Sequence, residues 1–128
     1  MEFKETQAIY LQITDYISEQ ILLERWKEGE RIPSVRELGA ALQVNPNTAM
    51  RAYDLLQNMD VIFNKRGVGF FVMKDAKKKI KAYKKQLFAK QELPLIFKTM
   101  DLLEISMSEF EEKFNTYIKN KNKDENKQ

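Results

Sequence analysis

The sequence predicts a mostly helical domain with one small β-hairpin, followed by a short helical segment. Three observations predict this fold class. Apolar residues recur at helical spacing over residues 8–26 and again over residues 46–59, and the spacing then changes from helical to extended over residues 61–72. A chain of 128 residues, of which 43% are hydrophobic and 32% charged, can hold one domain of ordinary size plus an appendage.

The composition excludes several classes of functional site. The chain has no cysteine and no histidine, which removes disulfides, thiolate nucleophiles, zinc–thiolate sites and the commonest general base. The carboxylates are predicted to lie on helix surfaces without a phosphate-binding loop or a set of metal ligands, so we expect no enzyme, no cofactor and no metal. No apolar run approaches the roughly 18 residues that span a bilayer, and no export signal is present. We therefore expect a cytoplasmic protein with no membrane partner.

The net charge of +3 conceals a basic block in the middle of the chain. Residues 61–90 hold 10 Lys and Arg against 1 Asp, whereas residues 1–60 hold 6 against 10 acidic residues and residues 91–128 hold 6 against 8. Such a block is either a solvated face or a surface for a polyanion, and composition alone leaves both open.

The N-terminal third of the chain predicts two helices. Apolar residues at helical spacing predict that the first covers residues 8–26 and ends where Gly29 supplies a left-handed residue. A short connector, ERIP, follows. Ser34 with Glu37 three residues later is a capping box, which predicts a short second helix over residues 35–42.

A third helix is predicted to begin at Pro46. Asn45 can cap the backbone N–H groups of the first turn, and proline needs no N–H partner at the first helical position. One side of this helix is apolar, and the other carries Asn47, Met50, Arg51, Asp54 and Asn58. Amides and guanidinium groups pair bidentately with adenine and guanine edges, so we predict that Asn47 and Arg51 read the bases of double-stranded DNA.

Residues 61–72, VIFNKRGVGFFV, predict a hairpin with a basic tip. β-Branched and aromatic residues flank the tip, where glycines permit a tight turn. Three helices followed by such a hairpin form a winged helix-turn-helix. Lys65 and Arg66 of the wing can then lie over a phosphate backbone or reach into a minor groove.

Arg36 is locally unfavourable in the second helix. It occupies the second helical position, where the helix dipole disfavours a cation by about 0.3–1 kcal/mol. A cation beside N–H groups that attract anions indicates a shared phosphate or base partner. The alternative is a surface arginine paired with a nearby carboxylate.

Residues 28–72, EGERIPSVRELGAALQVNPNTAMRAYDLLQNMDVIFNKRGVGFFV, resemble the DNA-binding domain of GntR-type bacterial transcription regulators. The pattern is Gly-x-x-(Ile/Leu)-Pro-Ser-x-Arg-x-Leu, then Val-(Asn/Ser)-x-x-Thr and a glycine-rich wing, and with the first helix it covers residues 8–73. The form Asn-Pro-Asn-Thr…Arg-Ala-Tyr is similar to the YtrA-like branch, whereas several other branches place the arginine at the position of Met50. The resemblance implies DNA contacts at Ser34, Arg36, Asn45, Asn47, Thr48 and Gly67.

After residue 73, apolar residues at helical spacing form stripes that predict further helices. Pro94 is expected to separate or kink the first two of them. Ser106 with Glu109 predicts the start of a last helix that runs to about Ile118, followed by a polar, loose tail from Lys119. The residues predicted to pair two copies are Ile80, Tyr83, Leu87, Leu93, Ile96, Phe97, Met100 and Leu103. The alternative is that these stripes fold back on the first helix of the same protomer.

The sequence therefore predicts a winged helix-turn-helix over residues 1–73, a helical dimerisation segment over 74–120 and a flexible tail over 121–128. Three short helices do not easily enclose a metabolite, and the YtrA-like branch implies a short dimerisation segment instead. The lysines between residues 74 and 90 either extend a phosphate-contact surface or keep this segment soluble.

The function predicted is a sequence-specific transcription regulator, a repressor, that binds DNA as a homodimer. Two third helices would enter successive major grooves about 34–36 Å apart on a near-palindromic operator. The YtrA-like branch implies a transporter operon as the target. Two alternatives stay open: a winged helix that binds an acidic protein, and a ligand-gated regulator whose unknown effector binds at the dimer interface.

Overall fold

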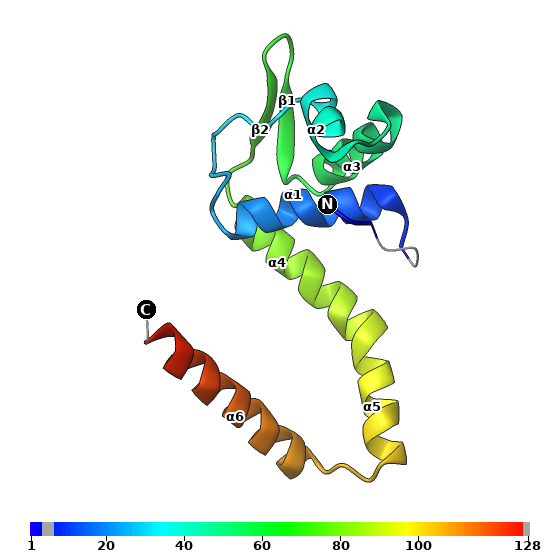
Figure 1. Cartoon of the computed structure of the whole chain (residues 1–128), viewed down its shortest axis with the longest axis vertical. Coiled ribbons are helices and arrows are strands. Elements are labelled where there is room, and N and C mark those ends of the chain that lie inside the picture. Colours follow the sequence, from blue (N-terminus) through cyan, green and yellow to red (C-terminus); the bar gives the residue numbers. More distant parts are fainter. Residues whose placement is uncertain (4–6, 127–128) are drawn as a thin grey trace. The chain divides into compact units, whose positions relative to one another are not determined.

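The computed structural model describes residues 1–3 and 7–126, and the chain divides into two compact units, residues 1–85 and 86–128. The first unit contains α1 (Ile9–Leu22), α2 (Val35–Leu42), α3 (Pro46–Asn58) and the antiparallel strands β1 (Ile62–Lys65) and β2 (Gly69–Val72). It ends within α4 (Ala76–Leu87). The second unit contains a π-helical turn, η1 (Phe88–Glu92), then α5 (Leu93–Leu102) and α6 (Met107–Glu125). Figure 1 shows these elements, and they confirm the predicted fold class.

The first helix ends earlier than the apolar spacing predicts. It stops at Leu22, and Glu24 with a φ of 60°, not Gly29, supplies the left-handed residue after it. The backbone N–H groups of Arg25 and Trp26 both donate to the carbonyl of Gln20, so the chain folds back on the helix end. Trp26 then packs edge-on against Tyr16, with ring centroids 6.2 Å apart. The apolar pattern outlasts the helix because Trp26 packs beside α1 without being part of it.

The caps of α2 and α3 form as predicted. The N–H of Glu37 donates to Ser34 Oγ and the N–H of Ser34 donates to Glu37 Oε1, both at 3.1 Å. The N–H of Asn47 donates to Asn45 Oδ1 at 2.8 Å, and α3 begins at Pro46. These bonds satisfy N–H groups that have no partner inside a helix, so they fix where both helices start.

A third extended segment joins the hairpin. The N–H of Gly29 donates to the carbonyl of Val72, and the N–H of Ile32 donates to the carbonyl of Phe70, both at 2.9 Å. In return, the N–H of Val72 donates to the carbonyl of Glu30 at 3.0 Å. The connector before α2 therefore pairs with β2 and ties the wing to the helix-turn-helix.

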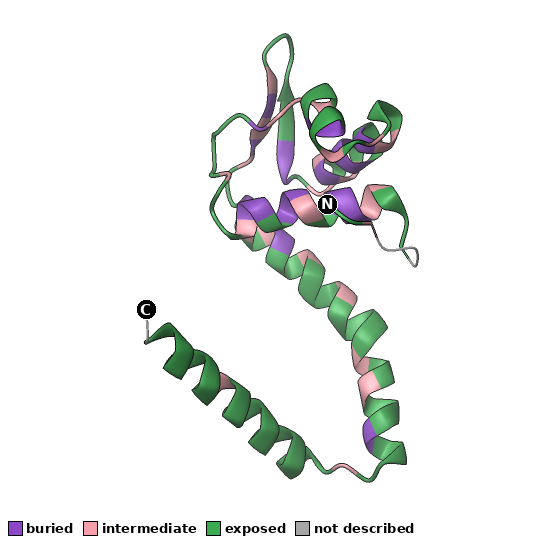
Figure 2. Ribbon diagram, in the orientation of Figure 1, coloured by how far each residue is buried: buried purple, intermediate pink, exposed green. Residues whose placement is uncertain are grey.

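The core of the first unit lies between α1, α3 and the hairpin, as the buried positions in Figure 2 show. Tyr53 of α3 is fully buried at its centre. Its hydroxyl donates to the Pro33 carbonyl at 2.6 Å, and its ring meets Phe70 edge-on with centroids 4.9 Å apart. The other large side chains that are fully buried are Ile13, Ile17, Ile32, Leu56, Val61, Ile62, Val72 and Ile80.

The first turns of α4 also belong to this core. Ala76 and Ile80 have no exposed surface and lie in the same apolar cluster as Ile13, Ile17 and Ile21 of α1. Lys84 forms an ion pair with Asp15 of α1 at 3.6 Å. For Ile80, therefore, the structure shows the alternative in which the stripe folds back on its own protomer. The compact unit extends past residue 73 for the same reason.

The C-terminal helices α4 and α5 are separate elements, as the prediction at Pro94 expects, but the chain end differs from the prediction. Helical backbone continues from α4 through η1 into α5, with Pro94 in the first turn of α5. Proline has no N–H to donate and its ring crowds the preceding turn, and the π-helical turn η1 lies directly before the helix that Pro94 opens. Ser106 caps α6, which runs to Glu125 instead of ending near Ile118. Residues 127 and 128 of the predicted tail lie outside the described residues.

No helix in the described part of the chain is long and apolar enough to cross a membrane.

Replacing Tyr53 by Phe should lower the free energy of unfolding by about 0.5–1.5 kcal/mol. The ring keeps its contact with Phe70, but the Pro33 carbonyl loses its donor. Urea unfolding followed by circular dichroism measures the loss. Tyr117→Phe, in exposed α6, is the control, and equal midpoints for the two variants would contradict a stabilising role for the Tyr53 hydroxyl.

Replacing Ile80 by Ala should lower the free energy of unfolding by about 2–5 kcal/mol, because it leaves a cavity in the core of the first unit. Lys81→Ala, at the next and exposed position, should change it by less than about 0.5 kcal/mol. Thermal unfolding at several protein concentrations provides the measurement. A loss for Ile80→Ala that grew on dilution would instead place this side chain in a subunit interface.

Candidate nucleic-acid interface

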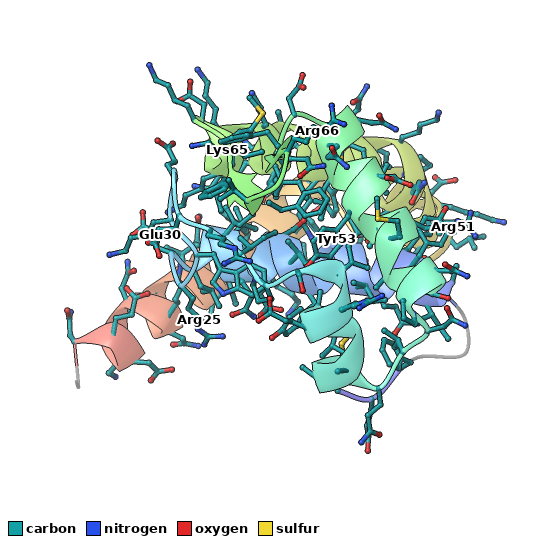
Figure 3. The ribbon with its side chains drawn as sticks, turned by 90° about the horizontal axis from the view of Figure 1, so that it is seen from above. Arg25, Glu30, Arg51, Tyr53, Lys65 and Arg66 are labelled. Atoms are coloured by element: carbon teal, nitrogen blue, oxygen red, sulfur yellow. The ribbon has the colours of Figure 1, made fainter. Side chains whose placement is uncertain are left out.

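One side of α3 is buried and the other is open, as the spacing predicts. Ala49, Ala52, Tyr53 and Leu56 have no exposed surface. The opposite side exposes the polar residues Asn47, Arg51, Asp54 and Asn58 together with Met50. Figure 3 shows Tyr53 directed into the unit and Arg51 on the outer side of the helix. Burial of the apolar side thus fixes which side chains α3 can offer to a partner.

At the helix starts, the predicted DNA contacts Ser34 and Asn45 also serve as helix caps. Ser34 Oγ and Asn45 Oδ1 each accept a backbone N–H at the start of a helix. The hydroxyl proton of Ser34 and the side-chain N–H₂ of Asn45 take no part in these two bonds. Thr48, in the first turn of α3, is half-buried. Donors are what the acceptor oxygens of a phosphate backbone require.

Arg36 is exposed at the start of α2, and it forms no ion pair with any described residue. Among the described residues, therefore, Arg36 has no carboxylate partner of the kind that the alternative, a surface arginine in an ion pair, requires.

Glu37, the next residue, takes part in the cap of α2 through its side chain. The backbone hydrogen bond from Ser34, and then its side-chain bond, hold the pKa of Glu37 below the ordinary value.

The wing exposes its basic tip. Lys65 pairs with Gly69 across the hairpin, and Lys65 and Arg66 are both exposed. Gly67 has a φ of 78°, a left-handed conformation that favours glycine in the turn. Figure 3 shows Lys65 and Arg66 at the same end of the unit.

Arg31 is a candidate residue that the sequence did not reveal. A Cβ added to Gly69 would lie 2.8 Å from Arg31 Nε, so the Arg31 side chain passes over this glycine of the wing. Arg31 is exposed, and its backbone bridges to Phe71. It therefore adds a third cation beside Lys65 and Arg66. Only the pairing of residues 29–32 with β2 reveals it, because nothing local in the sequence distinguishes this arginine.

Tyr10 of α1 is a second residue that sequence reasoning missed. Arg51 Cζ lies 4.0 Å from the centroid of the Tyr10 ring, which is a cation–π contact. Tyr10 is half-buried and Arg51 is exposed. The spacing of apolar residues assigns Tyr10 to an ordinary amphipathic helix, and only the packing of α1 on α3 brings it to the arginine.

Several lysines of the basic block have partners within the first unit. Lys77 pairs with Glu24 at 3.4 Å, Lys84 pairs with Asp15, and Lys79 Nζ donates to the carbonyl of Asp60 at 3.1 Å. These three lysines hold α4 to the rest of the unit. The block is therefore partly structural.

The residues predicted to pair two copies differ in exposure. Ile80 and Met100 are buried, whereas Phe97 and Leu103 are 55% and 67% exposed. Tyr83, Leu87, Leu93 and Ile96 are half-buried. A further exposed row on α6 was missed by the prediction and contains Met107, Phe110, Phe114 and Tyr117.

Comparisons with known proteins identify the family. The family described as bacterial regulatory proteins, gntR family, matches residues 9–72, which is half of the chain. The crystal structure of a GntR-family transcriptional regulator from Bacteroides thetaiotaomicron is 45% identical, with a TM-score of 0.80 over 89% of this chain and 99% of that one.

Two proteins of Bacillus subtilis strain 168 are also similar. The HTH-type transcriptional regulator YhcF is 35% identical over 75 residues, which cover 59% of this chain and 62% of YhcF. The HTH-type transcriptional repressor YtrA is 36% identical over 74 residues, which cover 58% of this chain and 57% of YtrA. The chain therefore spans less than two thirds of either relative. The helix-turn-helix, its wing and these matches place the chain in the GntR family of bacterial transcription regulators, which bind DNA and are not enzymes.

Proposed function

We propose that this regulator is a cytoplasmic repressor that binds a near-palindromic operator as a homodimer. The observation that carries the proposal is the exposed side of α3, where Asn47 and Arg51 stand one helical turn apart while the opposite side is fixed in the core. The name of the similar protein YtrA, a transcriptional repressor, supports the sign of regulation.

The exposed groups divide by chemistry into base readers and backbone contacts. Asn47 and Arg51 present an amide and a guanidinium, which pair bidentately with adenine and guanine. Asp54, one turn further along α3, would repel phosphate, so the N-terminal half of α3 enters the major groove. The residues proposed to contact the DNA backbone, from the helix starts or from the wing, are Ser34, Arg36, Asn45, Thr48, Lys65, Arg66 and Gly67. Phosphate contacts orient the protein and base contacts give specificity.

The second unit supports pairing with another copy. Phe97, Leu102 and Leu103 are more than half exposed, and α6 exposes its own row of apolar side chains. Exposed apolar patches of this kind mark interaction surfaces in soluble proteins. A homodimer would cover them and set two α3 helices about 34–36 Å apart, one helical turn of DNA. Ile80 takes no part in the proposed interface, because it is buried in its own protomer.

Selection of genomic fragments with the purified protein, followed by footprinting, tests the whole proposal. We expect a near-palindrome with half-sites about one helical turn apart. The YtrA-like resemblance suggests that it precedes a transporter operon. Recovery of fragments without a shared sequence would contradict a sequence-specific regulator.

Asn47→Ala and Arg36→Ala should weaken DNA binding in different ways. Asn47→Ala should cost roughly 1–3 kcal/mol at the selected operator and little on unrelated DNA, because a base contact is lost. Arg36→Ala should weaken binding to all sequences and flatten the salt dependence by about one unit, because a phosphate contact is lost. Fluorescence anisotropy from low to near-physiological salt distinguishes them. The same behaviour in both variants would contradict the assigned roles.

Phe97→Asp should dissociate the dimer, because a carboxylate would be buried in an apolar interface. Sedimentation equilibrium measures the mass, and circular dichroism checks that the helices remain. Thr99→Asp adds the same charge to an exposed position of α5 and is the matched control. If Phe97→Asp still sedimented as a dimer, the interface would not include this face of α5.

A further inference from the structure

The contact between Tyr10 and Arg51 joins the first turn of α1 to the exposed side of α3. Arg51 Cζ lies 4.0 Å from the centroid of the Tyr10 ring. Helix α1 is anchored by Ile13, Ile17 and Ile21, which are buried in the core against α3. Tyr10 itself is half-buried. The ring is thus a fixed surface on which a long, flexible side chain is held.

Arg51 contacts the Tyr10 ring and not the carboxylate that stands nearest to it along its own helix. Asp54 stands three residues after Arg51, a spacing at which an arginine and a carboxylate often pair on a helix surface. No ion pair joins Arg51 to Asp54 or to any other described residue. The cation–π contact uses the charge of the guanidinium but none of its N–H donors. Arg51 is therefore restrained while its hydrogen-bonding groups stay available.

We infer that Tyr10 is a positioning residue that sets the base preference of Arg51. This rests on the proposed function, in which Arg51 reads a base. Bidentate recognition of a base requires a guanidinium in one orientation. Holding the side chain before binding lowers the entropy that is lost in the complex. A residue of α1, outside the helix-turn-helix, then contributes to sequence specificity without touching DNA.

The experiment compares four variants with the unchanged protein: Tyr10→Leu, Tyr10→Phe, Arg51→Ala and the double variant Tyr10→Leu/Arg51→Ala. Each is titrated against the selected operator, against its single base-pair variants and against unrelated DNA at one salt concentration. Thermal unfolding is recorded in parallel. Tyr16→Leu is the matched control, because Tyr16 is also a half-buried tyrosine of α1 but packs on Trp26.

Tyr10→Leu should weaken operator binding about two- to fivefold, the effect of an exposed cation–π contact. It should reduce the difference in affinity between operator variants at the same base pair that Arg51→Ala affects, and it should leave binding to unrelated DNA unchanged. Tyr10→Phe should retain both affinity and preference, because a phenyl ring still attracts the cation. Adding Tyr10→Leu to Arg51→Ala should cause no further loss.

Three results would overturn the inference. Independent losses from Tyr10→Leu and Arg51→Ala would show that the two residues do not act together. Equal losses of specificity in Tyr10→Leu and Tyr16→Leu would make Tyr10 a general support of α1. Unchanged base preference in Arg51→Ala would remove Arg51 as a reader, while a palindromic operator for the unchanged protein would still support the proposed function. If the unchanged protein preferred no sequence, the proposed function itself would fail.

Discussion

Tyr53 is the residue on which the arrangement of the first unit depends. Its ring lies between α3 and the Phe70 ring of β2, and its hydroxyl holds the Pro33 carbonyl just ahead of α2. One side chain thus connects the helix-turn-helix to the wing. Burial, and to a smaller extent the charge of Glu37, raise the pKa of Tyr53 far above its ordinary value, so the hydroxyl remains a donor at any physiological pH.

The exposed chemistry follows from that core. Because Ala49, Ala52 and Tyr53 must face inward, Asn47 and Arg51 face outward on the same helix. The total charge of a segment says less about where DNA could bind than the positions of its individual cations. Residues 1–60 are acidic in total, yet the cations Arg31 and Arg36 lie among them. Conversely, two lysines of the basic block after the wing form ion pairs with carboxylates of α1 and the turn after it.

The sequence predicts best what is decided within one helical turn. The caps at Ser34 and Asn45 involve partners two or three residues away, and the hairpin tip carries its own glycines, so both could be predicted. The contacts that were missed join distant residues. Gly29 pairs with Val72, Arg31 crosses Gly69, and Tyr10 meets Arg51. The burial of Ile80 likewise depends on α1, so its helical spacing alone fitted a dimer interface equally well.

The two capping side chains have a consequence for how such a domain can vary. An aspartate in place of Ser34 or Asn45 would cap its helix about as well as the present residue, since its oxygen accepts the same N–H. In the proposed complex, it would also put a carboxylate in front of the phosphates of DNA and offer them no donor. Selection for folding alone would therefore tolerate aspartate at either position. Only binding to a negatively charged partner would select against it. At these two positions, the residue type therefore carries information about the ligand that stability measurements do not detect.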